Sequence, residues 1–180
     1  MDNKLFISSG FDQVNLSWII PILNDFIKLR KIDGIVFESK LDFYQANNNP
    51  KFKKILNNYN NIFFKTNYLI TFLYFLTNFF KVLKFLYYIF KKQIIIKNNW
   101  EDTQILHAIW DSAKLNLSKK EYIASNFDLL YSTLRVFYKY FIFLENQKKY
   151  KFRTLFLSHS VYHYRTYIVA SKKLKLEIFN

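Results

Sequence analysis

The segment 158–165 holds the densest cluster of side chains that could do chemistry. Its polar members are Ser158, His159, Ser160, Tyr162, His163, Tyr164 and Arg165. The cluster follows an apolar run and opens a helical pattern, where free backbone N–H groups and the helix dipole favour an anion. His159 could act there as a general base or bind phosphate, and Arg165 could hold a phosphate or carboxylate. In the alternative interpretation a serine caps the helix and the histidines lie at its interface.

His107 and Asp111 form a second candidate pair. They are four residues apart in the predicted helix 101–113, so they share one face of it. Asp111 either holds His107 in one tautomer or faces solvent. His159 and His163 have the same spacing, which suits zinc ligands, but position 160 lacks the glutamate of an HExxH motif. We therefore expect no metal site and no cofactor.

The composition excludes several kinds of site. The chain of 180 residues contains no Cys and two Gly, and it is 51% hydrophobic and 21% aromatic. The absence of Cys excludes a disulfide framework, a thiolate metal site and a Cys nucleophile. Two Gly are too few for a Walker A loop or a GxGxxG fingerprint, and no Ser stands in a GxSxG elbow. The apolar content excludes disorder over most of the chain.

The charge is strongly positive and unevenly spread. The chain has 27 basic and 13 acidic residues, a net charge of +14, and no acidic residue occurs between Asp42 and Glu101. Lysines with interleaved aromatic residues could neutralise phosphates and stack on bases, but no recognised nucleic-acid module is present, and we expect no nucleic-acid partner. The N-terminus also lacks the pattern of a signal peptide, which predicts a cytoplasmic protein.

The segment 62–92 is both basic and aromatic. Its longest charge-free stretch, 66–80, has 15 residues, fewer than the roughly 20 that a transmembrane helix needs. On a helical projection the lysines fall on one face and the apolar residues on the other. The lysines are Lys81, Lys84, Lys91 and Lys92, and the apolar residues are Leu83, Leu86, Tyr87 and Phe90. Such a helix either lies in a membrane interface on anionic lipid or packs on a sheet with solvated lysines.

Strand-like runs alternate with helical patterns along the chain. We predict strands at 4–8, 35–37, 93–96, 154–157 and 176–179. We predict helices at 18–29 with Ser17 as cap, 51–59, 64–90 as one long or broken helix, 101–113, 121–147 and 162–173. The asparagine-rich segment 45–50 predicts a loop, and the asparagine cluster at 57–61 predicts a break in the element that follows this loop. The alternation predicts one α/β domain over residues 1–180, with a Rossmann-like, mainly parallel sheet flanked by helices.

Ligands of such folds bind beyond the carboxyl ends of the strands. This rule points to residues 8–12, which include Gly10, and to residues 38–40, 97–100 and 158–164.

Four segments, read in order, resemble a known family. They are residues 34–38, 105–112, 155–159 and 162–179. Together they resemble the N-terminal half of bacterial capsular or surface-polysaccharide biosynthesis proteins, a glycosyltransferase-like group with two Rossmann-type domains. Trp110 and Asp111 match a Tyr-Asp pair of the family, and His159 and Tyr162 match its His and Tyr. His107, and Leu106 before it, stand where the family has Asp and Gly.

The resemblance implies a fold like the N-terminal domain of a GT-B-type glycosyltransferase and a sugar or glycan acceptor as partner. It implies His159 and Asp111 as catalytic residues. It implies a ligand contact by Tyr162. The polar cluster itself predicts contacts by Ser158, Ser160, His163 and Arg165. The rule for strand ends predicts one by Gly10, and His107 is a further candidate on its helical face. We expect the family's second, donor-binding domain to be absent. The chain would then be an N-terminal part or truncated product that is inactive alone and peripheral at the inner face of the plasma membrane. The alternative is a non-enzymatic membrane-interface protein anchored by residues 62–92.

Overall fold

The computed structural model describes residues 3–8, 13–93, 95–97, 99–115, 124–157 and 164–179 of the chain. These residues fall into two compact units. Unit 1 draws on residues 1–65, 146–159 and 175–180, and unit 2 draws on residues 66–145 and 160–174. Unit 1 contains the sheet, and unit 2 is helical in its described part.

Unit 1 is built on a five-stranded sheet in which all neighbouring strands are parallel. The strands are β1 (Lys4–Ser8), β2 (Gly34–Phe37), β3 (Asn60–Phe63), β4 (Thr154–Leu157) and β5 (Glu177–Phe179). Their order across the sheet is β3-β2-β1-β4-β5, which places β1 at the centre. This arrangement is a Rossmann-like α/β fold and confirms the predicted fold class.

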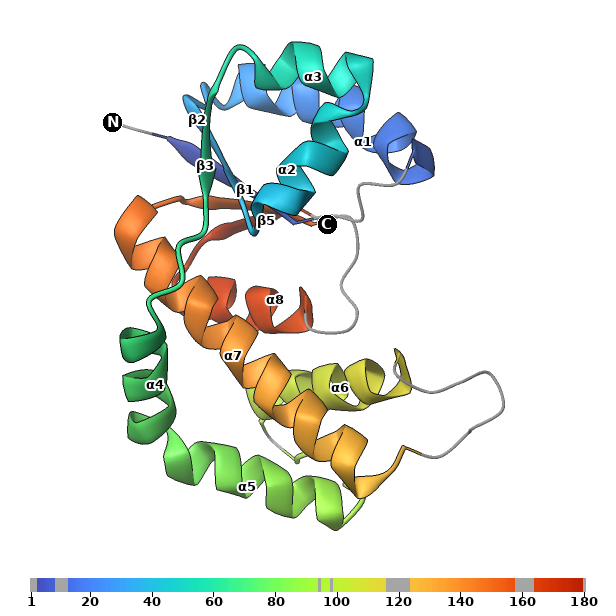
Figure 1. Ribbon diagram of the computed structural model, residues 1–180, viewed down its shortest axis with the longest axis vertical. Coiled ribbons are helices and arrows are strands. Elements are labelled where there is room, and N and C mark those ends of the chain that lie inside the picture. The colour runs from blue at the N-terminus through green and yellow to red at the C-terminus, as the bar shows by residue number, and fades with distance from the viewer. Residues whose placement is uncertain are drawn as a thin grey trace. The chain divides into compact units, whose positions relative to one another are not determined.

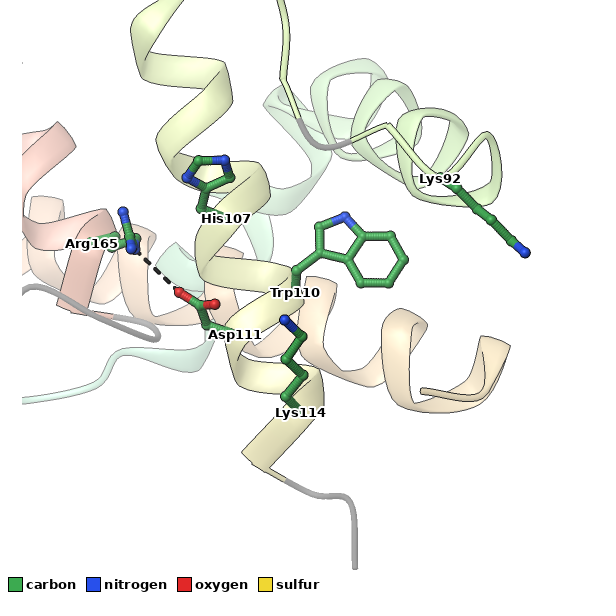
Figure 2. A pocket seen from close by; sticks show the side chains of 6 residues that line it. All are labelled: Lys92, His107, Trp110, Asp111, Lys114 and Arg165. Atoms are coloured by element: carbon green, nitrogen blue, oxygen red, sulfur yellow. Dashed lines mark ion pairs between the residues drawn. The ribbon is translucent and has the colours of Figure 1, made fainter. Parts of the chain in front are cut away.

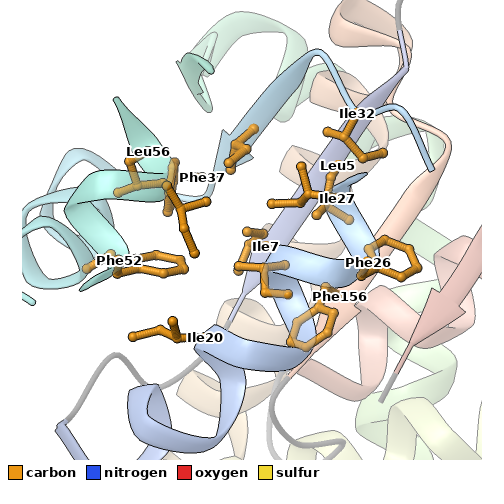
Figure 3. Packing of buried hydrophobic residues seen from close by; sticks show 14 residues of the cluster. Leu5, Ile7, Ile20, Phe26, Ile27, Ile32, Phe37, Phe52, Leu56 and Phe156 are labelled. Atoms are coloured by element: carbon orange, nitrogen blue, oxygen red, sulfur yellow. The ribbon is translucent and has the colours of Figure 1, made fainter. Parts of the chain in front are cut away.

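Three helices of unit 1 lie together on one face of the sheet (Figure 1). They are α1 (Gln13–Leu29), α2 (Lys40–Asn47) and α3 (Pro50–Leu56). Leu5 and Ile7 of β1 are fully buried in the same core as Ile27 of α1 and Phe52 of α3 (Figure 3). Burial of this apolar surface is the main favourable contribution to folding of the unit.

The other face of β1 is also covered. Phe6 is fully buried, and its ring stacks on Phe64 at 4.8 Å and on Phe152 at 5.3 Å between centroids. A central strand buried on both faces explains why Leu5, Phe6 and Ile7 form a continuous apolar run rather than an alternating one.

α1 begins earlier than predicted. The helix starts at Gln13, so Ser17, the predicted cap, lies inside it together with Pro21. Proline removes one backbone N–H and normally disfavours a helix interior. The buried side chains of Leu23 and Ile27 hold the helix on the sheet and outweigh this local preference.

An asparagine and a serine begin the two helices that replace most of the loop predicted over 45–50. Asn49 accepts hydrogen bonds from the N–H groups of Lys51 and Phe52 at 3.0 and 3.2 Å and so starts α3. Ser39 starts α2, whose last residues occupy 45–47 of the predicted loop. That part of the loop prediction was wrong, because these side chains satisfy free N–H groups at helix starts as readily as they form turns.

β3 was not predicted. Its residues Asn60 and Asn61 read as a helix break, yet they pair with Gly34 and Ile35 of β2. β3 is an edge strand whose side chains are at most partly buried. A strand that contributes little to the core carries only a weak apolar signal in the sequence.

Unit 2 contains four helices and most of a fifth among its described residues. They are α4 (Tyr68–Thr77), α5 (Phe79–Phe90), α6 (Trp100–Leu115), α7 (Asn126–Tyr150) and α8 (Tyr164–Lys173). Aromatic contacts tie them together. Phe85 of α5 lies 5.4 Å from Phe137 of α7, and Phe143 of α7 stacks on Tyr167 of α8 at 5.0 Å.

The helix predicted over 64–90 is broken. α4 and α5 meet at Asn78, which leaves helical geometry with φ −109° and ψ 16°, and their axes are bent by 68°. Within the described residues no single helix is long and apolar enough to cross a membrane. In the described part of the chain the bent pair of α4 and α5 together has the required length and composition.

The strand predicted over 93–96 was wrong. Gln93, Ile95 and Ile96 are not in a strand. The backbone N–H and carbonyl of Ile96 both bond to the hydroxyl of Thr103, at 3.0 and 3.2 Å. A β-branched run favours a strand only where a neighbouring strand can pair with it. Lys97, Asn99 and Trp100 therefore do not follow a strand and do not belong to the predicted ligand-binding edge.

Candidate functional site

One face of α6 carries four side chains that line a pocket of about 480 Å³ in unit 2. They are His107, Trp110, Asp111 and Lys114, and Lys92 after α5 and Arg165 of α8 complete the lining (Figure 2). The α6 residues follow the spacing of a single helical face. We call this site the Trp110 pocket.

The start of α6 is fixed by a reciprocal cap. The side chain of Asn99 accepts a hydrogen bond from the N–H of Asp102 at 3.0 Å and donates one to its carboxylate at 3.0 Å. Asp102 is buried and also binds Lys84 of α5 at 2.8 Å. This hydrogen bond raises the pKa of Lys84. Asp102 lies in the first turn of α6, where its negative charge suits the helix dipole, and its contact with Lys84 joins α5 to α6.

α6 packs on α8, and this contact sets the opposite wall of the pocket. Both helices carry small, completely buried side chains, Ala108 and Ser112 on α6 and Ala170 on α8, which let helices approach closely. At the other end of the contact Lys172 lies 3.9 Å from the ring centroid of Trp100, a cation–π contact.

Arg165 is held by two partners on α6. Its Nη1 donates to Oε1 of Gln104 at 2.9 Å, and its Nε lies 3.3 Å from Oδ2 of Asp111. The Nε contact is an ion pair without hydrogen-bond alignment, since Nε has no hydrogen-bond partner. Both charged side chains remain partly exposed, so the pair adds little stability. Its effect is to orient the guanidinium group at the pocket wall.

Trp110 is held by its indole nitrogen. Nε1 donates to the carbonyl oxygen of Gln93 at 3.1 Å. This bond fixes the orientation of the ring that lines the pocket. The irregular segment after α5 therefore supports the site, although it forms no strand.

Three of the nine predicted site residues meet in the Trp110 pocket: His107, Asp111 and Arg165. The other six predicted site residues are Gly10, Ser158, His159, Ser160, Tyr162 and His163, and they lie outside the described residues.

No protein family, curated protein or solved structure matches the chain.

Asp111 pairs with Arg165 rather than with His107, the partner that the sequence suggested. Within the described residues no hydrogen bond joins Asp111 to His107. Trp110 and Lys114 were missed as site residues, although their spacing of three and seven from His107 places them on the same face. Lys92 and Gln104 carried no such signal, because only tertiary packing brings them to the site.

The predicted ligand-binding edge of the sheet is described only in part. At the carboxyl ends of β1 and β2 the hydroxyl of Ser8 donates to Oε2 of Glu38 at 3.5 Å. Residues 9–12 and 158–163, which were predicted to complete this edge, lie outside the described residues.

The lining of the Trp110 pocket is cationic. Three cations, Lys92, Lys114 and Arg165, and one carboxylate, Asp111, give it a formal charge of +2 with His107 neutral. Such a lining favours an anionic ligand with an uncharged part. The indole ring offers that part a flat apolar surface.

Proposed function

We propose that the chain binds an anionic saccharide in the Trp110 pocket, as the acceptor-side part of a glycosyltransferase-related protein of capsule or surface-polysaccharide biosynthesis. The observation that supports this proposal is the oriented indole ring of Trp110 beside the cations Lys114 and Arg165. The second support is the resemblance of the strand, helix and Ser-His segments to capsular or surface-polysaccharide biosynthesis proteins.

The pocket suits a saccharide in size and chemistry. Its volume of about 480 Å³ falls within the roughly 300–1,000 Å³ of typical small-molecule sites. The apolar face of a sugar ring can lie on the indole of Trp110. A phosphate or carboxylate on the sugar can bind Lys114 and Arg165, while Asp111 and His107 can accept hydrogen bonds from hydroxyl groups.

The catalytic roles of Asp111 and His159 remain predictions of the resemblance. Asp111 lines the pocket and could accept a proton from an acceptor hydroxyl. We expect the Trp110 pocket to hold an acceptor rather than a donor, because the resembling proteins hold the donor in a second domain.

Calorimetric titration tests the proposal, with glucose 1-phosphate as the probe. Glucose 1-phosphate should bind more tightly than glucose or inorganic phosphate, since the pocket offers both a stacking surface and cations. Uridine diphosphate glucose should bind no better than glucose 1-phosphate if the site serves an acceptor. Trp110→Ala should weaken binding at least about tenfold, the scale of losing one aromatic contact and its buried area.

A charge variant with a matched control completes the test. Lys114→Gln changes an exposed residue of α6 that lines the pocket, and it should weaken binding of glucose 1-phosphate. Lys173→Gln changes an exposed residue at the end of α8 that is not among the lining residues, and it should bind like the unmodified chain. Binding of glucose 1-phosphate that is undetectable, or unchanged in Trp110→Ala, would contradict the proposal.

A further inference from the structure

The outward surface of α4 and α5 is apolar, and we call it the α4–α5 face. It consists of eleven large side chains exposed by 38–84%: Tyr68, Leu69, Ile70, Phe72, Leu73, Leu76, Phe79, Phe80, Leu83, Tyr87 and Phe90. Single exposed apolar residues are common, but a series along two consecutive helices marks an interaction surface.

α4 buries a polar residue and exposes apolar ones, the opposite of a helix whose outer side faces water. The buried residue of α4 is Thr71, and its hydroxyl has no hydrogen-bond partner in the described part of the chain. Tyr74 stacks on Phe141 of α7 at 5.6 Å, while Phe72 and Leu73 are exposed by half or more. A helix that faced water there would place Thr71 outside and its leucines inside.

α5 is apolar on two sides. Val82, Phe85 and Ile89 are buried against the rest of unit 2. Phe80 and Leu83, with Tyr87 and Phe90 on the same stripe, point outward. Lys84 is exposed and Lys81 is partly buried, so the lysines of α5 do not lie with the buried residues of the helix.

Two lysines of α5 are held by contacts within unit 2. Lys84 binds Asp102 at 2.8 Å, and Lys81 lies 5.8 Å from the ring centroid of Tyr140. Burial lowers the pKa of Lys81. Lys91 and Lys92 follow the end of α5 and are exposed.

The charge of this surface has one sign. No acidic residue occurs between positions 42 and 101. α4 has no charged side chain, and every charged side chain on α5 and in the turn after it is a lysine. A protein partner would have to be acidic and apolar at once. An anionic bilayer supplies both properties over a large flat area, with apolar tails below charged headgroups.

We propose that the α4–α5 face docks on an anionic phospholipid bilayer, with the two helices lying in the plane of its interface. Aromatic side chains such as Phe80 and Tyr87 enter the headgroup region, and Lys91 and Lys92 contact lipid phosphates. α4 has 10 residues and α5 has 12, each well short of the roughly 20 that span a bilayer. The 68° bend between them prevents a straight span.

Vesicle co-sedimentation tests this docking independently of any saccharide. The full chain should sediment with vesicles of equal parts phosphatidylglycerol and phosphatidylcholine and much less with phosphatidylcholine alone. The triple variant Phe80→Ser, Leu83→Ser, Tyr87→Ser changes only exposed side chains, so its far-UV circular dichroism should match the unmodified chain. Its partition onto anionic vesicles should fall at least about tenfold.

Matched control variants test whether vesicle binding depends on the α4–α5 face rather than on the overall hydrophobicity or charge of the chain. The triple variant Leu29→Ser, Leu41→Ser, Tyr44→Ser removes three apolar residues of unit 1 that are exposed by more than half, and it should leave partition unchanged. Lys91→Gln, Lys92→Gln should weaken partition, whereas Lys53→Gln, Lys54→Gln on α3 should not. High salt should weaken the binding further, since the lysine contribution is screened.

Four outcomes would overturn the proposal. In the first, the chain stays in the supernatant with anionic vesicles at low salt. In the second, the face variant and the unit 1 control partition equally onto the vesicles. In the third, the chain stays on the vesicles after an alkaline carbonate wash, which indicates a spanning segment. The fourth is concentration-dependent dimers in the absence of lipid that the face variant abolishes, measured by analytical ultracentrifugation, because the occupant of the face would then be a second copy of the chain.

Discussion

Asn146 of α7 satisfies both backbone groups of Lys65, the residue that follows β3 and Phe64. Its Oδ1 accepts a hydrogen bond from the N–H of Lys65 at 2.9 Å, and its Nδ2 donates to the carbonyl oxygen of Lys65 at 3.2 Å. Asn146 is completely buried. One side-chain amide therefore acts as a strand partner where the edge of the sheet ends.

Asn146→Ala should destabilise the protein by about 2–3 kcal/mol, because it removes two hydrogen bonds and leaves backbone groups without partners. Urea unfolding followed by circular dichroism measures the loss. Asn146→Asp is the matched variant, since it keeps an acceptor for the N–H of Lys65 and loses the donor. A free energy of unfolding unchanged in Asn146→Ala would show that the paired groups are equally well solvated by water.

Stability at alkaline pH should depend on Tyr140. Burial raises the pKa of its phenol to about 12, against 10.0 for an ordinary tyrosine. The folded state keeps the proton where the unfolded state has released it, so this raised pKa lowers stability as pH rises from about 10 to 12. The full difference corresponds to about 2–3 kcal/mol.

Tyr140→Phe removes this proton and should flatten the decline in the free energy of unfolding between pH 10 and 12. Urea midpoints at closely spaced pH values measure it. Below pH 9 the two profiles should run parallel, because the phenol is protonated in both states there. Equal slopes above pH 10 would show that Tyr140 titrates as an exposed tyrosine does.

Lys31 ends α1 in a conformation that glycine adopts more easily. Its φ is 50°, and its N–H bonds to the carbonyl of Lys28 while that of Ile32 bonds to Ile27, the pattern of a Schellman turn. Lys31→Gly should therefore stabilise the protein, by up to about 1 kcal/mol. The thermal midpoint measures the gain.

Lys28→Gly is the control for this change. It places the same residue within the last turn of α1, where it should destabilise by about 1 kcal/mol. Destabilisation by both variants would show that the Lys31 side chain contributes more than its backbone conformation costs.

Asp111 should reduce the attraction of the Trp110 pocket for simple anions, since its carboxylate lies 3.3 Å from Arg165. Asp111→Asn raises the formal charge of the lining from +2 to +3. Inorganic phosphate should then bind about threefold to tenfold more tightly at low salt. Phosphorus NMR titration measures the affinity, and unchanged binding would place the phosphate outside this pocket.

The central strands could be predicted from the sequence, whereas the sheet edge could not. β1 and β4 are buried on both faces, so they appear as continuous apolar runs. β3 is an edge strand with two asparagines, whereas Ile95 and Ile96 have strong strand preference but lie outside any strand. Local preference decides neither case, because strand formation depends on a partner that is distant in the sequence.

The chain's residues by themselves determined the Rossmann-like class, the helical face that carries His107 and Asp111, and the positive charge of the region before α6. These properties follow from the periodicity of apolar residues and from counting charges. Only the tertiary structure decided that Arg165 faces Asp111, that Lys92 and Trp110 line the same pocket, and that the apolar side of α4 points outward. Those relationships depend on how helices pack, and packing is set by side-chain shape across the whole unit rather than by spacing along one helix.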